Sequence, residues 1–329
     1  MHVTLITGAT GFLGRHLIDQ LRKEDPGSAL RVLCRGSSDW DQSCGVEEVR
    51  GDITRAEDVL RAADGTDEIY HLAGFVSRNP EDAPRLYRTH IEGTRNVCEA
   101  ARLQGVRKVL IVSSSGTIAV SSEPVVHRED SGYKNVQVAE WPYYVSKIFA
   151  EKLAFDYQSR YSLPLTVVNP SLILGPGDDR RSSTGDVALF LAGQILAIPR
   201  GGLSFVDVRD AARGLVSAMR LGRPGERYLL GGTNWTFEEL IETVARLSGR
   251  HAPTLKPSLR FSLLSAHLLR LTYPLAGKRF DLDDASIKMS ARFWYCDSTK
   301  ARTELGFETR DPMETLRDTI ADLRAKRAS

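Results

Sequence analysis

The sequence predicts an α/β fold: a doubly wound parallel sheet with helices on both faces, followed by a smaller lobe. Three observations predict this fold. The chain opens on the apolar run 2–7, which leads through a glycine-rich turn into a helical pattern. Short apolar runs then alternate with helical patterns through the first half of the chain, and such alternation is typical of right-handed βαβ units. After Pro170 proline and glycine become frequent and the helices become shorter, which indicates a second lobe.

The individual elements follow from hydrophobic periodicity. The acidic residues Glu81 and Asp82 suit the start of a long helix. We expect a first domain over 1–170, to which a strand and helix at 203–221 return, and a smaller lobe made of 171–202 and 222–329. The predicted strands of the first domain are 2–7, 30–35, 47–51, 67–72, 107–113 and 164–169, its helices are 12–23, 55–63, 81–104 and 141–160, and the helices of the lobe are near 236–249, 258–272, 298–305 and 312–326.

Composition fits a soluble globular protein and argues against several classes of partner. The 329 residues carry 44 Lys and Arg against 42 Asp and Glu, a net charge of +2, so neither nucleic acid nor an anionic surface is an expected partner. The longest apolar stretch, 259–276, is interrupted by charged residues and proline, so no membrane span is expected. Since the chain opens directly on a predicted strand, we expect no signal or transit peptide and a cytoplasmic location.

Metal and disulfide chemistry are not expected. The four cysteines are scattered with no Cys-x-x-Cys pair, and the seven histidines form no ligand cluster. Free thiols in a reducing cytosol are the simpler interpretation of this pattern.

The glycine turn predicts a dinucleotide site. Gly8, Gly11 and Gly14 lie three residues apart between the first strand and the first helix. The first glycine allows a sharp turn, the second allows the backbone to approach a pyrophosphate, and the third allows the helix to pack close to the strand. The helix N-terminus then offers free N–H groups and a partial positive charge to the phosphates. A glycine triplet also occurs for tight packing alone, so a second motif is needed.

That second motif is W-P-Y-Y-V-S-K, which places Tyr143 and Lys147 one helical turn apart on the same face. A free tyrosine has a pKa near 10, and a nearby ammonium together with a positively charged nicotinamide ring would favour the phenolate. Lowering the pKa by about three units requires roughly 4 kcal/mol. Tyr143 is therefore a candidate acid–base residue. Tyr144 points elsewhere on the helix and is interpreted as packing.

Together these segments resemble the extended short-chain dehydrogenases/reductases, the NAD(P)-dependent epimerase/dehydratase superfamily. Within it they resemble the branch of dihydroflavonol reductases and 3β-hydroxysteroid dehydrogenases. The resemblance covers nearly the whole chain and implies a Rossmann domain over 1–170 with a substrate-binding lobe. It is carried by the glycine turn, the serine run 113–115 and Tyr-x-x-x-Lys, and by G-D-I-T (51–54), H-L-A-G (71–74), E-G-T-R-N-V (92–97), N-P-S-L-I-L-G-P-G-D (169–178), F-V-D-V-R-D (205–210) and R-Y-L-L-G-G (227–232).

The resemblance implies a catalytic set of Ser114, Tyr143 and Lys147. Alignment of the strand end without gaps places the catalytic hydroxyl at Ser114, with Ser115 as the alternative, where it would hydrogen-bond the substrate oxygen. In the mechanism that the resemblance implies, Tyr143 would protonate a developing alkoxide or deprotonate an alcohol, and Lys147 would also hold the ribose hydroxyls. The positions implied to contact the cofactor are Gly8, Thr10, Gly11, Phe12, Leu13, Gly14, Arg35, Asp52, Ile53, Leu72, Ala73, Gly74, Ser113, Tyr143, Lys147, Asn169, Pro170 and Ser171.

The end of the second strand favours NADP over NAD. An NAD enzyme of this fold carries a carboxylate there for the ribose 2′-hydroxyl. Here Cys34 occupies the position and Arg35 follows, with Ser37 and Ser38 close behind. A guanidinium suits a 2′-phosphate through charge-assisted hydrogen bonds. An exposed arginine at a strand end is common in itself, so NAD stays possible.

Two departures from the family's sequence pattern narrow the set of possible reactions. Sugar-nucleotide dehydratases of this superfamily carry an Asp-Glu pair directly after the catalytic hydroxyl, whereas Ser115, Gly116 and Thr117 follow here. His90 stands where many extended members have asparagine, which weakens a sugar-epimerase interpretation; we assign it no role. The favoured function is an NADP-dependent ketone reductase or alcohol dehydrogenase. The alternatives are an NAD-dependent sugar or nucleotide-sugar epimerase and, more remotely, a non-catalytic nucleotide-sensing protein.

The segments expected to line the substrate cleft are largely apolar. We therefore expect a predominantly apolar ketone or its alcohol as substrate, because a nucleotide sugar would demand converging basic groups. A homodimer is the expected assembly by family habit. The candidate substrate contacts are Phe75, Ser115, Trp141 and Leu172.

Overall fold

The computed structural model describes residues 2–36, 45–272 and 283–328. Its larger part is a seven-stranded sheet in the order β10-β7-β5-β4-β1-β2-β3, in which every neighbouring pair is parallel. The predicted doubly wound parallel sheet is confirmed. The strands are β1 (Val3–Thr7), β2 (Ala29–Cys34), β3 (Val46–Arg50), β4 (Glu68–His71), β5 (Lys108–Val112), β7 (Leu165–Pro170) and β10 (Arg227–Leu230).

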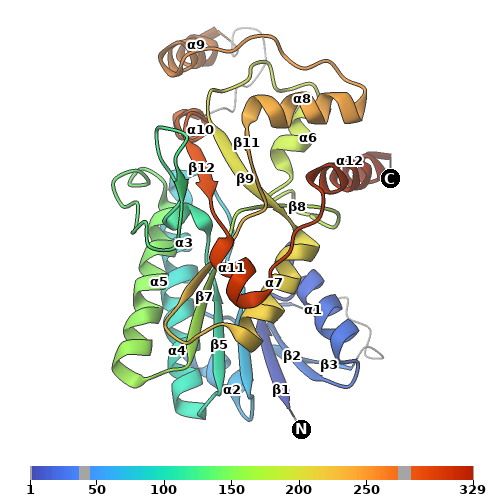
Figure 1. Cartoon of the computed structure of the whole chain (residues 1–329). Helices are drawn as coiled ribbons and strands as arrows, with labels where there is room; N and C mark the ends of the chain where they lie inside the picture. The colour runs from blue at the N-terminus through green and yellow to red at the C-terminus, as the bar shows by residue number, and fades with distance from the viewer. Residues whose placement is uncertain (1, 37–44, 273–282, 329) are drawn as a thin grey trace.

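Helices cover both faces of this sheet (Figure 1). On one face α1, α7 and α11 share a buried core that includes Leu17, Leu215 and Leu305. On the other face α2, α4 and α5 share a second core that includes Val97 and Ala154. Burial of the sheet on both faces explains why its strands appear in the sequence as continuous apolar runs. The helices are α1 (Phe12–Glu24), α2 (Ala56–Ala63), α4 (Gly93–Gln104), α5 (Pro142–Tyr161), α7 (Val208–Leu221) and α11 (Thr299–Leu305).

The segment predicted as one helix over 81–104 changes its winding along its length. A 3₁₀ turn at Pro80–Asp82 leads into α3 (Ala83–Tyr87), a π-helical turn at Arg88–Glu92 and then α4. The π turn carries His90, whose side chain is buried against Tyr143. Local π turns often occur at functional sites, and hydrophobic periodicity does not predict them.

A second, five-stranded arrangement forms the smaller lobe. Its path is β11-β9-β12-β6, and β8 pairs with β9. Leu174, Phe205 and Leu316 belong to its core, to which α6, α8 and α12 contribute. The elements are β6 (Val126–His127), β8 (Leu172–Leu174), β9 (Gly202–Asp207), β11 (Thr233–Thr236), β12 (Phe293–Cys296), α6 (Gly185–Leu191), α8 (Phe237–Ser248), α9 (Leu259–Thr272), α10 (Asp284–Ser290) and α12 (Pro312–Ala328).

Residues 203–221 were predicted to return a strand and a helix to the first domain, and the structure confirms only the helix. The helix α7 packs on α1 and covers the large sheet, as expected. The strand β9 instead belongs to the second sheet, and it is β10 that returns to the large sheet beside β7. Short apolar runs do not encode which sheet they join, because pairing partners are set by contacts that are distant in sequence.

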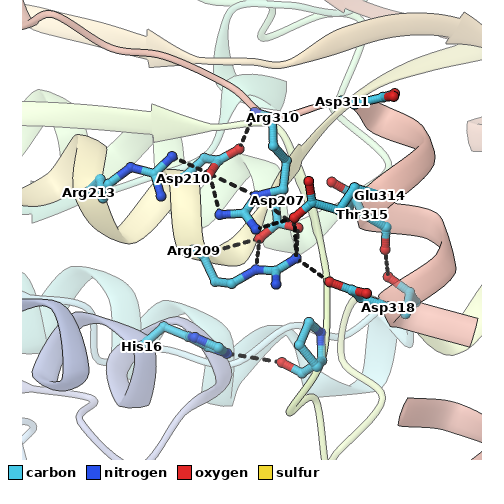
Figure 2. A network of polar contacts seen from close by, with 12 residues as sticks. His16, Asp207, Arg209, Asp210, Arg213, Arg310, Asp311, Glu314, Thr315 and Asp318 are labelled. Atoms are coloured by element: carbon cyan, nitrogen blue, oxygen red, sulfur yellow. Dashed lines mark hydrogen bonds and ion pairs between the residues drawn. The ribbon is translucent and has the colours of Figure 1, made fainter. Parts of the chain in front are cut away.

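A buried ionic network fastens α12 to the start of α7 (Figure 2). Arg310 donates to the Asp210 carboxylate from its backbone N (2.7 Å), Nε (3.0 Å) and Nη2 (2.8 Å). Asp207 accepts from the backbone N of Arg209 at 2.9 Å and pairs with its guanidinium at 2.7 Å. Both carboxylates are fully buried, so each depends on these partners. The network fixes α12 against the point where the chain passes from β9 into α7, the helix that covers the large sheet.

Candidate active site

The glycine turn has the geometry that a pyrophosphate needs. Gly8 has φ +77°, and a Cβ there would lie 2.6 Å from the backbone N of Ala73. A Cβ on Gly14 would lie 2.3 Å from the carbonyl oxygen of Gly8. Gly11 is the N-cap of α1 and provides no side-chain cap. The first amides of α1 therefore remain available to an anion, and the predicted contacts Thr10, Phe12 and Leu13 lie at the same turn.

The predicted catalytic residues come together at the carboxyl ends of the central strands. Ser114 follows β5, is the least buried of the three serines and lies close enough to the phenol of Tyr143 to lower its pKa. Lys147, one turn further along α5, donates from Nζ to the carbonyl oxygen of Val112 at 2.9 Å. Ser115, the alternative to Ser114, is buried in a short 3₁₀ turn. Ser114 and Tyr143, about 30 residues apart in the sequence, are thus close together in the structure.

Burial controls the acidity of this pair. It raises the pKa of Tyr143 well above its usual value near 10, Tyr144 adds to the rise, and the Ser114 hydrogen bond opposes it. Burial also lowers the pKa of Lys147 to about 8, while the negative charge of Glu151 opposes the fall. The expected lowering of the tyrosine pKa by Lys147 is not seen in this state of the protein. The reason is geometric, since the ammonium is directed to the Val112 carbonyl.

Asn169 and Ser113 face a buried network instead of the cleft. The Asn169 amide donates to Glu151 Oε1 at 2.7 Å, to the Ser114 carbonyl at 3.0 Å and to Thr117 Oγ1 at 3.1 Å. The hydroxyl of Ser113 donates to the same carboxylate oxygen. Both residues were predicted as cofactor contacts, which stays a prediction; their side-chain donors bind protein groups at the strand ends, while Asn169 Oδ1 has no partner among the described residues. The sequence analysis did not single out Glu151, although it lies one turn after Lys147.

The other predicted cofactor positions line the same edge of the sheet. Leu72, Ala73 and Gly74 follow β4, and the backbone N of Ala73 donates to Thr7 Oγ1 at 3.3 Å. A Cβ on Gly74 would lie 2.9 Å from His90 Nε2 and 3.7 Å from Lys147 Nζ, so glycine lets both approach. Pro170 ends β7, and Ser171 directly after it is buried.

Asp52 and Ile53 have clear local roles. The Asp52 carboxylate accepts from Thr54 N and Oγ1, both at 2.9 Å, which is the turn chemistry of aspartate. Ile53 is buried against Gly93, and its carbonyl accepts from Asn96.

Arg35 is exposed directly after β2, beside the buried Cys34. A cation is therefore accessible at the strand end where the fold holds the adenosine ribose. Ser37 and Ser38, which were expected beside it, lie outside the described residues.

Two of the predicted substrate residues lie among aromatic side chains. Trp141 packs against Trp294 with ring centroids 5.5 Å apart, and Tyr144 stacks on Trp294 at 4.8 Å and contacts Tyr143 at 5.0 Å. Phe75 contacts His90 at 6.2 Å and has the Arg85 guanidinium over its ring at 4.2 Å. Leu172, the third apolar residue, packs partly buried on the core of the second sheet. Trp294 was missed, because it lies about 150 residues from Tyr143 in sequence.

Comparison with known proteins identifies the family. The model of the NAD dependent epimerase/dehydratase family matches residues 4–231. This chain belongs to that family. It is 30% identical to sterol demethylase protein B of Methylococcus capsulatus, over 98% of each chain, and 31% identical to cinnamoyl-CoA reductase 1 of rice, over 76% of this chain and 77% of that protein. The crystal structure of gox2253 matches with a TM-score of 0.84 and 30% identity, over 99% of both chains.

The resemblance to the reductase-like branch of this epimerase/dehydratase family is confirmed by these relatives. Among the described residues no group of three or more potential ligands could hold a metal ion, and no helix of the described chain is long and apolar enough to cross a membrane. The family's nicotinamide dinucleotide fits the residues present. The glycine turn of Gly8, Gly11 and Gly14 admits no side chains, and the N-terminus of α1 has no side-chain cap.

Proposed function

We propose that the protein is an NADP-dependent oxidoreductase that interconverts a ketone and a secondary alcohol on a predominantly apolar small molecule. The observation that carries the proposal is the proximity of Ser114 to Tyr143, one turn from Lys147, at the sheet edge next to the glycine turn. A nicotinamide dinucleotide supplies or accepts the hydride in such chemistry. The residues of this chain would bind the substrate oxygen and transfer its proton.

Tyr143 would donate its phenolic proton to the oxygen of a carbonyl that is being reduced. A raised pKa suits this role in the resting protein, because the phenol is then fully protonated at neutral pH. Ser114 would donate a hydrogen bond to the same oxygen and stabilise the negative charge that develops there. Lys147, with a pKa of about 8, remains mostly protonated at pH 7 and would favour the phenolate that is left behind.

The aromatic side chains near Tyr143 support an apolar substrate. Tyr144, Trp141 and Trp294 pack against one another next to the phenol. Aromatic surfaces of this kind bind apolar and planar groups through buried area and ring contacts. A nucleotide sugar would instead need cations that converge on its pyrophosphate. Arg180 and Arg181, two of the candidate cations of this region, are exposed on the loop before α6.

Arg35 supports the choice of NADP over NAD. Its guanidinium is accessible at the end of β2, and the neighbouring position carries a thiol where an NAD enzyme has a carboxylate. Burial raises the pKa of the Cys34 thiol, so it stays neutral and offers no charge to a ribose hydroxyl.

The experiment is a turnover screen with both reduced and both oxidised cofactors. Hydrophobic ketones and secondary alcohols are tested beside UDP-, GDP- and dTDP-sugars, with Tyr143→Phe as the inactive reference. Conversion of an apolar carbonyl that depends on Tyr143 is the expected result. Turnover of a nucleotide sugar without any activity on apolar carbonyls would replace this proposal with a sugar epimerase, the second candidate that the family model allows.

A further inference from the structure

A small cavity lies beside Lys147. Its volume, counted as space open to the centre of a water molecule, is about 10 Å³. That is the size needed for one water molecule, provided that two to four polar groups surround it. The polar side chains that line the cavity come from β4, the π turn, α4, the end of β5 and α5, and are His71, His90, Thr94, Ser113, Lys147 and Glu151.

Glu151 is the acidic residue of this lining. Its side chain is fully buried, and it follows Lys147 by one turn of α5. The two charges make no direct ion pair within 4 Å, since the ion pairs of Glu151 in the described chain extend only to Arg227, at 3.5 Å. Its Oε1 accepts from Ser113 and Asn169, whereas its Oε2 lies 3.5 Å from Arg227 Nη1 and has no hydrogen bond of normal geometry in the described structure. A lysine and a carboxylate thus face one water-sized space without touching.

We propose that this cavity holds one ordered water molecule, which is hydrogen-bonded to both the ammonium of Lys147 and the carboxylate of Glu151. Glu151 is then a positioning residue that keeps Lys147 protonated beside Tyr143. Lysine offers three donors and a carboxylate only acceptors, so a water between them can accept from one and donate to the other. A bridging water transmits much of the energy of a direct contact.

The other charged and titratable groups around the pair do not replace Glu151. His71 and His90 face the cavity from β4 and the π turn, and burial lowers the pKa of both, to about 3 for His71, so both are neutral at pH 7. Tyr143 stays neutral on its own side of Lys147. Arg227 and Tyr133 face Glu151 from the far side, where the Arg227 guanidinium donates to the Tyr133 hydroxyl at 2.7 Å.

The charge of Glu151 opposes the fall in the Lys147 pKa that burial causes. Without it, Lys147 would lose its proton at a lower pH, and the tyrosinate would lose its nearby cation. This catalytic consequence rests on the proposed function, whereas the water and the protonation of Lys147 do not.

The first test measures the titration of Lys147 directly, in the full-length protein labelled with [13Cε]lysine. The NMR signal is assigned from its loss in Lys147→Arg. In Glu151→Gln we expect the pKa of Lys147 to fall by about one pH unit from its value of about 8, and Glu151→Asp should restore most of it. Asp156→Asn is the matched control, because it removes an exposed carboxylate from the same helix, and it should leave the titration unchanged. An unchanged Lys147 pKa in folded Glu151→Gln would overturn the proposal.

The second test needs no variant and decides the matter if Glu151→Gln does not fold, as judged by circular dichroism. A crystal structure of the wild-type protein at high resolution should show a water peak within hydrogen-bonding distance of Lys147 Nζ and a Glu151 carboxylate oxygen. A cavity without such a peak overturns the proposal.

The third test measures turnover of the screened substrate against pH. In Glu151→Gln the alkaline limb of the pH–rate profile should lie about one pH unit lower than in the wild type. The substitution should change kcat more than it changes KM. An alkaline limb identical to the wild type's would contradict a role through Lys147. If the wild type reduces no carbonyl at all, the proposed function fails, while the NMR and crystallographic tests still decide the present inference.

Discussion

The side-chain amide of Asn169 donates a 2.7 Å hydrogen bond to Oε1 of the fully buried Glu151. This bond links the end of β7 to the helix that carries Tyr143 and Lys147. The same amide donates to the Ser114 carbonyl at 3.0 Å, so one side chain fixes the end of β5 as well. A single polar side chain thereby holds three elements of the candidate active site in place relative to one another, as precise positioning of catalytic groups requires.

Tyr143→Phe should abolish hydride transfer while the fold persists. The substitution removes the phenolic proton but keeps the ring contacts with His90 and Tyr144. Loss of a general acid is worth on the order of 10²–10⁴ in rate, measured as kcat with the best substrate from the screen. Tyr144→Phe is the matched control, because it removes a neighbouring hydroxyl on the same helix and should retain most of the turnover. Substantial activity in Tyr143→Phe would mean that another group supplies the proton.

Arg35→Ala should weaken NADPH binding and leave NADH binding nearly unchanged. A charge-assisted hydrogen bond to phosphate contributes roughly 1.5–3 kcal/mol, which corresponds to a loss of about 10- to 150-fold in affinity for NADPH alone. Titration of both cofactors by fluorescence or calorimetry measures the difference. Equal losses for the two cofactors, or a wild-type preference for NADH, would rule out recognition of a 2′-phosphate by this residue.

Lys147→Met should change how stability depends on pH. Burial lowers the pKa of Lys147 to about 8 in the folded protein, against its usual value near 10.5 in the unfolded chain. Between these values the unfolded state binds more protons, so the stability of the wild type should rise with pH relative to the variant. The full difference is roughly 3 kcal/mol between pH 8 and 10.5. Urea denaturation of both proteins at several pH values over this window checks it, and parallel curves would show that Lys147 titrates normally.

Asp210→Asn should destabilise the fold by about 1.5–3 kcal/mol, because it removes the charge that accepts from Arg310 and leaves Asp207, 3.5 Å away, as the remaining buried counter-charge. Asp210 is fully buried and accepts three hydrogen bonds from Arg310. The control is Asp318→Asn, which removes a partly exposed partner of Arg209 at 2.7 Å and should cost less than about 1 kcal/mol. The free energies of unfolding come from chemical denaturation. Equal effects of the two substitutions would mean that burial of this network does not matter to stability.

The sequence by itself determined the large sheet and its order of alternating elements. Strands such as β1 and β5 are continuous apolar runs because both faces of the sheet are buried, and helices such as α1 show a single apolar stripe. The glycine turn and Tyr-x-x-x-Lys could also be predicted from the sequence, because each depends on spacing within one turn or one helix. These features are local, so the identity and order of neighbouring residues are enough to specify them.

Only the tertiary structure decided which distant residues share the site. It joined β9 to the second sheet and β10 to the first, turned Asn169 and Ser113 toward Glu151, and placed His90 under Tyr143. It also brought Trp294 to Tyr144 from the far end of the chain. Side-chain direction at a strand end and burial of a titratable group depend on what packs around them in three dimensions. Residue spacing along the chain carries no record of those neighbours, which is why the fold and the motifs could be predicted while the buried network beneath them could not.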